Sequence, residues 1–201
     1  MKRISSILAG LALLGLGACA STWQTDYSEP VPASVSKGWR VTNVQVVIPD
    51  GLTTSDKNTY APNFDIVWHG DEPGDRRAQV QGLLTSAVAE GAKGLRGGTP
   101  VTLQLVLAQF HAVTPLAVQR APAAVHDIRY TMTVFDSRGN TLTEPQFIKA
   151  DLPAFVGQQA FTAAQQGQTQ KVRITDHVAK VTAGWLGIGP DPRVTFTSVG
   201  R

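Results

Sequence analysis

The stretch DRRAQVQGLLTSAVAEGAKGLRGGTPVTLQLVL, residues 75–107, decides the fold class because it passes from a helical pattern to a strand pattern. In residues 80–88 apolar side chains recur at every third or fourth position, which predicts a helix with one buried face. Asp75 can accept hydrogen bonds from the first free amides as the N-cap, and Gly91 or Gly94 is expected to end the helix. In residues 101–107 every second side chain is apolar, which predicts a strand.

Alternation of the same kind predicts further strands on both sides of this stretch. The expected strands are residues 44–48, 64–68, 101–107 and 128–134, with a fifth around 147–152, and the expected long loops are 51–63 and 111–124. A second amphipathic helix is expected over 174–185, whereas 157–170 stays open between helix and loop. The sequence therefore predicts an α+β fold: a two-layer sandwich with a mainly antiparallel sheet of four to five strands and two amphipathic helices on one face.

The first 18 residues have the composition of a secretory signal peptide. Lys2 and Arg3 supply the positive start, and residues 7–18 form an uncharged apolar segment. That segment has 12 residues, whereas a helix that spans a bilayer needs about 20. We therefore expect residues 1–18 to be a lipoprotein signal peptide that is removed, and not a transmembrane anchor.

The end of this signal has the pattern of a lipobox. An aliphatic residue, two small residues and a cysteine follow one another as Leu16, Gly17, Ala18 and Cys19. Acylation requires the thiol, and the signal peptidase requires small side chains before the cut. Because Cys19 is the only cysteine, its acylation leaves no thiol for a disulfide, a nucleophile or a metal site. The sequence predicts cleavage before Cys19 and a membrane anchor made of acyl chains such as palmitate.

The expected location is the periplasmic side of a bacterial membrane. Ala20 follows the cysteine, and by similarity to enterobacterial sorting the lack of Asp there favours the outer membrane. Residues 19–37 are rich in Ser, Thr and Pro, and are interpreted as the lipidated cysteine and a flexible tether. The rest is divided into a single α+β periplasmic domain at 38–192 and a polar C-terminal tail at 193–201.

The basic balance of the chain is largely a property of its signal. The formal net charge is +3, but the 18 basic side chains without Lys2 and Arg3 leave 16 against 15 acidic ones. Nucleic-acid binding needs clustered Lys and Arg. We therefore expect no nucleic-acid partner.

The sequence contains no recognisable catalytic or metal-binding pattern. Its histidines are His69, His111, His126 and His177, and none has HExxH spacing or carboxylates at ligand spacing. A GxSxG elbow is absent, and the glycine-rich stretches follow expected helices, whereas a phosphate loop must precede one. The sequence therefore predicts no metal, no cofactor and no enzyme activity.

One group of polar residues is interpreted as a docking surface at one end of the sheet. It combines the run before the second expected strand with the turn before the helix, where two arginines oppose the helix dipole. Its members are Tyr60, Asn63, Asp71, Glu72, Asp75, Arg76 and Arg77. A solvated turn with an N-cap is the alternative explanation of the same residues.

Four stretches of the chain resemble a family of alphaproteobacterial envelope lipoproteins of unknown function. They are YAPNFDIVWHGDEPGDRRAQV (60–80), APAAVHDIRYTM (121–132), LTEPQFIKADLPA (142–154) and AGWLGIGPDPR (183–193). The resemblance extends from about Trp23 to the end of the chain. It implies an envelope location and a shared domain, and it supplies no functional residue.

Two functions are open from the sequence. The anchor, the tether and the absence of a catalytic pattern favour a non-catalytic accessory or binding subunit of an envelope assembly, with an envelope protein as partner. The alternative is a periplasmic hydrolase, which a concave pocket with perturbed carboxylates or histidines would indicate.

Overall fold

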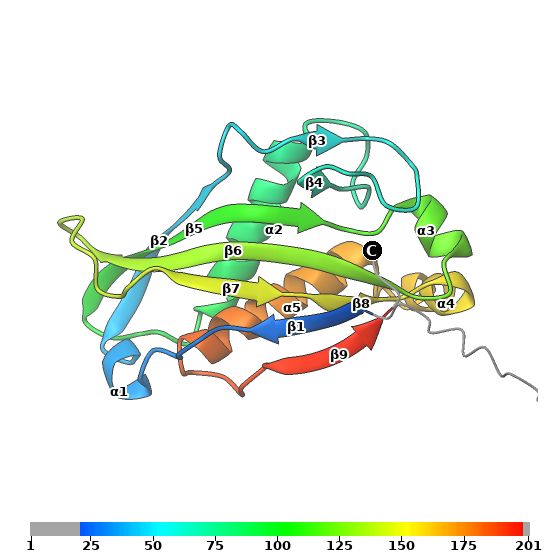
Figure 1. Ribbon diagram of the computed structural model, residues 1–201. Helices are drawn as coiled ribbons and strands as arrows, with labels where there is room; N and C mark the ends of the chain where they lie inside the picture. Colours follow the sequence, from blue (N-terminus) through cyan, green and yellow to red (C-terminus); the bar gives the residue numbers. More distant parts are fainter. Residues whose placement is uncertain (1–20, 199–201) are drawn as a thin grey trace, which may run out of the picture.

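The computed structural model describes residues 21–198, in which a long curved sheet carries helices on one side (Figure 1). The strands of this part are β1 Ser21–Asp26, β2 Trp39–Val47, β3 Thr54–Ser55, β4 Ile66–Val67, β5 Thr99–His111, β6 Ala124–Asp136, β7 Gln146–Ala150, β8 Leu152–Ala154 and β9 Val194–Ser198. Its helices are α1 Ala33–Ser36, α2 Arg76–Gly91, α3 Pro115–Arg120, α4 Gly157–Gln165 and α5 Gln170–Trp185. The predicted α+β class is confirmed.

The two longest strands, β5 and β6, form the centre of the sheet. They are antiparallel, with Val101 opposite Asp136 at one end and His111 opposite Asp127 at the other. The sheet order is β3-β4-β5-β6-β7-β1-β9, with β2 paired to β5 and β8 paired to β6 outside this path. Most neighbours are antiparallel, whereas β2–β5, β3–β4 and β4–β5 are parallel.

The expectation of four to five strands is wrong, since the described chain contributes nine strands to the sheet. Two of the additional strands, β3 and β8, have two and three residues. An alternating pattern needs about four residues to be recognised, so strands this short cannot be predicted from periodicity. The expected strand at 64–68 is present but shorter, as β4 Ile66–Val67.

Part of the segment interpreted as a flexible tether is a strand of the sheet, and Val31 and Ser36 further along are buried, so that interpretation is wrong for residues 21–37. β1 pairs antiparallel with β7 and β9, and Trp23 and Tyr27 are buried. The backbone N of Val31 donates to the carbonyl oxygen of Trp185 at 2.7 Å, which holds the next turn against the end of α5. Polar composition suggested a linker, but strand formation here depends on partners far away in the chain.

The expected C-terminal tail also contains a strand, which corrects the domain boundaries. β9 pairs with β1 along its whole length, from Val194 opposite Thr25 to Ser198 opposite Ser21. The domain therefore extends over the full described range, 21–198, instead of 38–192.

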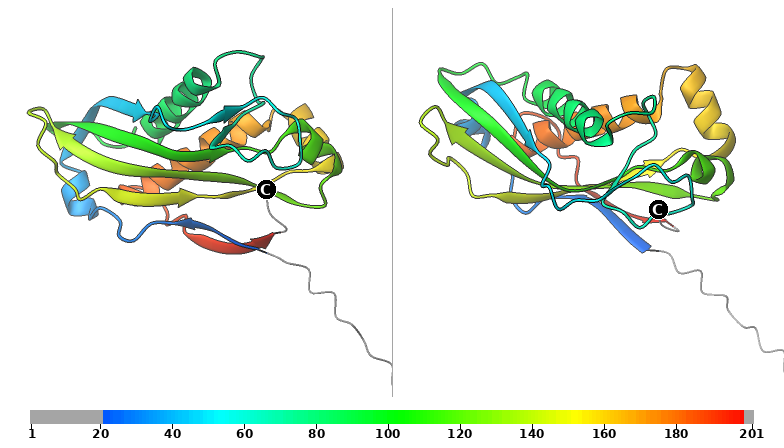
Figure 2. Two further views of the ribbon diagram at one scale, coloured as in Figure 1. Left: turned by 45° about the horizontal axis from the view of Figure 1, so that its top comes forward. Right: turned by 90° about the horizontal axis from the view of Figure 1, so that it is seen from above.

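Both predicted helices form, and they lie together on one face of the sheet (Figure 2). The carboxylate of Asp75 accepts hydrogen bonds from the backbone N of Arg77 and of Ala78, so the predicted N-cap is confirmed. α2 ends at Gly91, where a Cβ atom would lie 2.3 Å from the carbonyl oxygen of Ala179 on α5. The absence of a side chain at Gly91 therefore lets the two helices approach closely over the sheet.

Three short helices were not predicted. α3 lies within the expected loop 111–124, where the hydroxyl of Thr114 accepts from the backbone N of Ala117 as an N-cap, and α4 lies in the stretch left open at 157–170. α3 and α4 contact each other. They lie at the same end of the molecule as the start of β1 and the end of β9 (Figures 1 and 2).

The main core fills the space between the sheet and the pair α2 and α5. Every second side chain of β5 from Val101 to Leu107 is buried in it, and Trp68 meets Phe110 edge to face with ring centroids 5.7 Å apart. No helix of residues 21–198 lies over the opposite face of β2, β5, β6 and β7 (Figure 2). We call it the open face; it displays Asn43, Gln45, Thr102, Gln104, Arg129, Thr131, Phe147 and Lys149.

Candidate functional site

The structure gathers the predicted docking residues near the start of α2, but it uses several of them inside the fold. Arg76 is only 8% exposed. Its Nε donates to the Asp56 carboxylate at 2.6 Å. Its Nη1 donates to the carbonyl oxygens of Asp71 and Glu72 at 3.2 and 3.1 Å and to Gln79 Oε1 at 2.9 Å. The guanidinium therefore fastens the 71–75 turn to the first turn of α2.

Arg77 has a similar internal role on the other side of the helix. Its guanidinium donates to the carbonyl oxygens of Ile48, Pro49 and Leu52 at 3.0, 2.7 and 2.9 Å. The loop that follows β2 is thereby held against α2. Both arginines therefore have partners inside the fold. These contacts explain why two cations stand at the start of a helix, and no external binding partner is needed to explain them.

Asp71 connects the turn to α5. Its carboxylate accepts from Trp68 Nε1 at 2.8 Å and from Lys171 Nζ at 2.5 Å. Burial raises the pKa of Asp71, but the hydrogen bonds from Lys171 and Trp68 together hold it below its ordinary value. Beside this ion pair a groove of about 740 Å³ runs between α2 and α5, with Asp71, Glu72 and Asp176 in its lining.

Tyr60 and Asn63 lie in the loop between β3 and β4, and both are exposed. Their neighbours attach the loop to the sheet: His111 Nε2 lies 2.7 Å from the carbonyl oxygen of Pro62, and the Thr114 hydroxyl donates to a loop carbonyl at 2.6 Å. The docking role of the surface around Tyr60, Asn63 and Glu72 stays a prediction.

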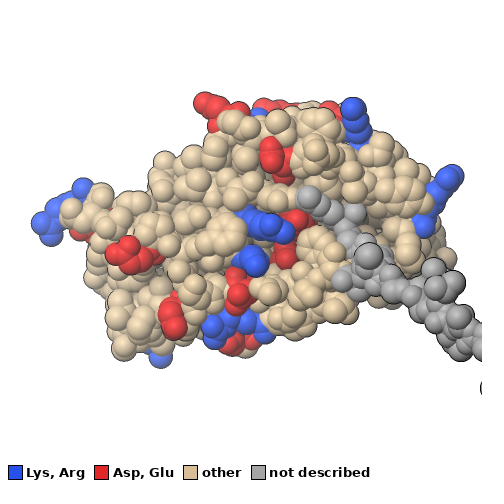
Figure 3. Space-filling view, in the orientation of Figure 1, with Lys and Arg blue, Asp and Glu red and all other residues tan. Residues whose placement is uncertain are grey.

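A second polar cluster, which the sequence analysis missed, lies on the open-face side of the sheet where β7 passes into β8. Asp127 and Asp151 are 1% and 2% exposed. The Asp127 carboxylate pairs with Arg129 Nε at 2.7 Å and accepts from Gln109 Nε2 at 3.2 Å. Asp151 accepts from the backbone N of Gln24 on β1 at 3.1 Å. Figure 3 shows this face, with acidic and basic side chains together near its middle.

Burial raises the pKa of Asp151 to about 6. The hydrogen bond from the backbone N of Gln24 partly offsets this effect, the negative charge of Asp127 raises the pKa further, and Arg129 lowers it. Two carboxylates in a dry environment repel each other, so one of them binds a proton more readily than in water. Asp127 and Asp151 are far apart in the sequence, and only the pairing of β6 with β7 and β8 brings them together.

The buried His177 lies close to this cluster. His177 Nε2 lies 3.2 Å from the hydroxyl of Thr25, which donates to the carbonyl oxygen of Asp151 at 2.9 Å. Burial lowers the pKa of His177 to about 4 and that of His126 to about 3. Both rings are therefore neutral at pH 7. Within residues 21–198, no group of three or more His, Cys, Asp or Glu side chains is arranged to hold a metal ion.

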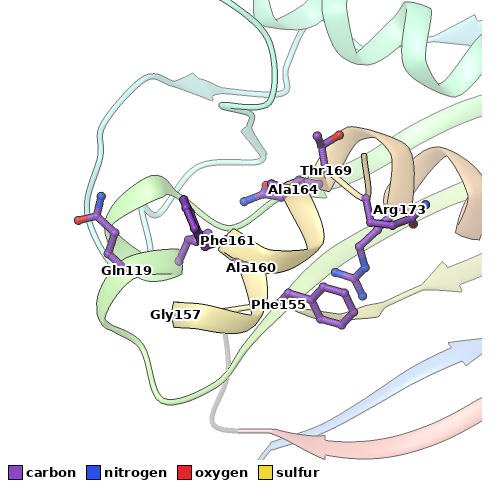
Figure 4. A pocket seen from close by; sticks show the side chains of 11 residues that line it. Gln119, Phe155, Gly157, Ala160, Phe161, Ala164, Thr169 and Arg173 are labelled. Atoms are coloured by element: carbon purple, nitrogen blue, oxygen red, sulfur yellow. The ribbon is translucent and has the colours of Figure 1, made fainter. Parts of the chain in front are cut away.

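An apolar groove of about 490 Å³ lies between α3, α4 and the start of α5 (Figure 4). Phe161 stands at this groove with 59% of its surface exposed. The guanidinium of Arg173 lies 3.4 Å from the centre of the Phe155 ring and donates to the carbonyl oxygen of Pro153 at 2.8 Å. The groove is thus apolar with one cation, and that cation already has partners.

Residues 39–201 match the model of a protein family described as a family of unknown function, DUF6778. The chain belongs to this family. Membership in DUF6778 supplies no activity for the chain. No curated protein matches it closely enough to be a relative.

Two solved structures are similar to this DUF6778 chain at a low level. One is a proposed lipoprotein from Caulobacter crescentus CB15, with 15% identity and a TM-score of 0.33, covering 79% of this chain and 97% of the other. The second is a PelC dodecamer from Paraburkholderia phytofirmans, with 11% identity and a TM-score of 0.33, covering 82% of this chain and 96% of the other. At these scores neither the fold nor the assembly of those proteins is carried over to this chain.

The predicted anchor falls outside the described residues, since Leu16, Gly17, Ala18 and Cys19 all precede Ser21. In the described part of the chain, none of the helices has the length and apolar character needed to cross a membrane.

Proposed function

We propose that this protein is an acyl-anchored lipoprotein on the periplasmic side of a bacterial membrane, and that it is a non-catalytic binding subunit of an envelope assembly. The lipobox that ends at Cys19 is the observation that carries the proposal. Because Ala20 follows the cysteine, we place the protein in the outer membrane. An alphaproteobacterial origin, which the resemblance implies, belongs to the same proposal.

The open face supports a binding role because it is broad, polar and free of helices. Gln104 Nε2 donates to Gln45 Oε1 at 3.2 Å across β5 and β2, so amide side chains of neighbouring strands meet on this surface. Phe147 is 48% exposed on the same face, and Lys149 lies next to it in β7. An exposed aromatic ring beside polar groups and a cation is typical of protein–protein contacts. We infer that an envelope protein binds here.

Site-specific photo-cross-linking in cells tests the proposal. A photoreactive amino acid replaces Phe147 on the open face, and the matched control replaces the exposed Glu90 near the end of α2. We expect defined adducts with one envelope protein from position 147 and none from position 90. A Cys19→Ser version should lose the adducts, and the mass of the mature wild-type N-terminus should show acylation. An unmodified N-terminus, or equal adducts from both positions, would contradict the proposal.

A periplasmic hydrolase is the second candidate, and the raised pKa of Asp151 is the observation in its favour, because perturbed carboxylates gather at catalytic sites. However, Asp151 lines neither the groove between α2 and α5 nor the one at α4. Incubation of the purified protein with isolated cell wall separates the two functions. If the wild type releases soluble fragments and the Asp151→Asn variant does not, the protein is a hydrolase and the binding function is wrong.

A further inference from the structure

We propose that the end of the molecule formed by α3 and α4 rests on the lipid surface of the membrane, with Phe161 inserted among the lipid headgroups. This inference depends on the proposed acyl anchor at Cys19 and adds to it a fixed orientation of the domain. We call this end, residues 112–121 and 153–169, the membrane-facing end. Its position relative to the anchor and its lack of acidic side chains carry the inference.

The strand register places the start of β1 at this end. Gln24 lies beside Asp151, since the backbone N of Asp151 donates to the carbonyl oxygen of Gln24 at 3.1 Å. β1 runs antiparallel to β7, so the chain from Gln24 back to Ser21 extends in the same direction as β8 on the way to α4. Figures 1 and 2 show the start of β1 and α4 at the same end of the sheet from three directions.

An anchor at Cys19 would therefore lie at the same end of the sheet as α4. Cys19 precedes Ser21 by two residues, and two residues of extended chain reach at most about 7 Å. Because β1 is already part of the sheet at Ser21, the chain has no tether long enough to lift the domain away from the bilayer. Acyl chains on Cys19 hold this end of the sheet against the membrane.

The surface at this end is suited to contact with lipid. Residues 108–126 and 152–170 contain no Asp, Glu or Lys, and their single charged side chain is Arg120. In Figure 3 the visible part of the right-hand end, where α3 lies in Figure 1, shows a basic side chain and uncharged surface. Lipid phosphates attract arginine and repel carboxylates, so a surface with this composition can approach them without electrostatic cost.

Phe161 supplies the apolar contact. It projects from α4 with 59% of its surface exposed, and the neighbouring groove is lined by small and apolar side chains such as Val118, Ala160 and Ala164. Figure 4 shows Phe161 on the side of α4 that is turned toward α3. Aromatic side chains on a short helix are characteristic of membrane interfaces, where one face of the helix is buried to a depth of about 5–10 Å.

Spin labelling of the full acylated chain in vesicles tests this orientation. Because acylation uses the only native cysteine, an introduced cysteine is the only thiol available for labelling. A nitroxide is attached at Phe161→Cys, and the matched control carries it at Ser137→Cys, an exposed turn position after β6 at the opposite end of the sheet. The vesicles consist of phosphatidylethanolamine and phosphatidylglycerol, and collisions of each label with oxygen and with a water-soluble nickel chelate are measured.

We expect the ratio of oxygen to nickel collisions to be several-fold higher at position 161 than at position 137. If mass spectrometry shows an acylated N-terminus but the two positions give equal ratios, the orientation is wrong while the anchor stands. If the N-terminus carries no acyl chain, the proposed function fails and this inference fails with it. Dipolar broadening between labels at position 161, together with protection from both reagents, would assign this end to a second copy of the chain and overturn the membrane contact.

Discussion

Replacement of Asp151 by Asn should stabilise the protein at neutral pH. In the folded chain burial raises the pKa of Asp151 to about 6, with a further contribution from the charge of Asp127. Asn has nearly the same shape and can still accept the hydrogen bond from the backbone N of Gln24. The substitution therefore removes a desolvated negative charge and retains the main contact of the side chain.

The size of the effect follows from the pKa shift. The carboxyl group has an ordinary pKa of 3.8 and a folded pKa of about 6, and one pKa unit corresponds to about 1.4 kcal/mol, so the shift is equivalent to about 3 kcal/mol. The folded state binds this proton more tightly than the unfolded state. The resulting stabilisation is complete below pH 3.8, falls as the pH rises, and is lost above the folded pKa. The Asn side chain does not titrate, so the variant does not lose this stabilisation as the pH rises.

Urea unfolding of the wild type and of Asp151→Asn at a series of pH values between 4 and 8 measures the effect. The buried histidines change stability in the opposite sense, because the pKa values of His126 and His177 are lowered on folding. Those two contributions are common to both proteins, so the difference in unfolding free energy between variant and wild type isolates Asp151. We expect this difference to increase in favour of the variant by up to about 3 kcal/mol from pH 4 to pH 7.5. A difference that stays constant over this range would refute the reasoning.

Three further predictions concern packing, the buried guanidinium and the histidines. Gly91→Ala should lower the unfolding free energy by about 1–3 kcal/mol, because its Cβ would collide with the Ala179 carbonyl. Gly82→Ala on the same helix, which has open space, should raise it by up to about 1 kcal/mol; equal effects in thermal unfolding would contradict the close helix approach. Arg76→Met should destabilise the fold by about 2–3 kcal/mol in urea because the buried guanidinium loses its ion pair with the exposed Asp56 carboxylate and its bonds to two carbonyl oxygens, and an unchanged midpoint would show that the guanidinium is dispensable. The wild type should lose stability as the pH falls below 6.5 because His177 stays neutral in the fold, with a folded pKa of about 4; His177→Gln should reduce that loss, and identical pH profiles would disprove the assignment.

Local patterns in the sequence were sufficient for the strongest elements. The apolar period of residues 80–88 and the carboxylate of Asp75 predicted α2 together with its N-cap, and alternation predicted the central parts of β5 and β6. These signals are reliable because each depends only on residues that are close in sequence, within one or two helical turns or within one strand. The lipobox is local in the same sense, since its four residues are adjacent and do not depend on the fold.

Only the tertiary structure decided how distant parts of the chain use one another. Ser21–Asp26 becomes a strand because β7 and β9 lie beside it, and Arg76 is a structural cation because Asp56 lies within reach. The charge of Asp127 acts on Asp151 because β6 lies next to β7 and β8. Strand pairing and burial depend on contacts between residues that are far apart in sequence, and neither composition nor periodicity records which segments will meet.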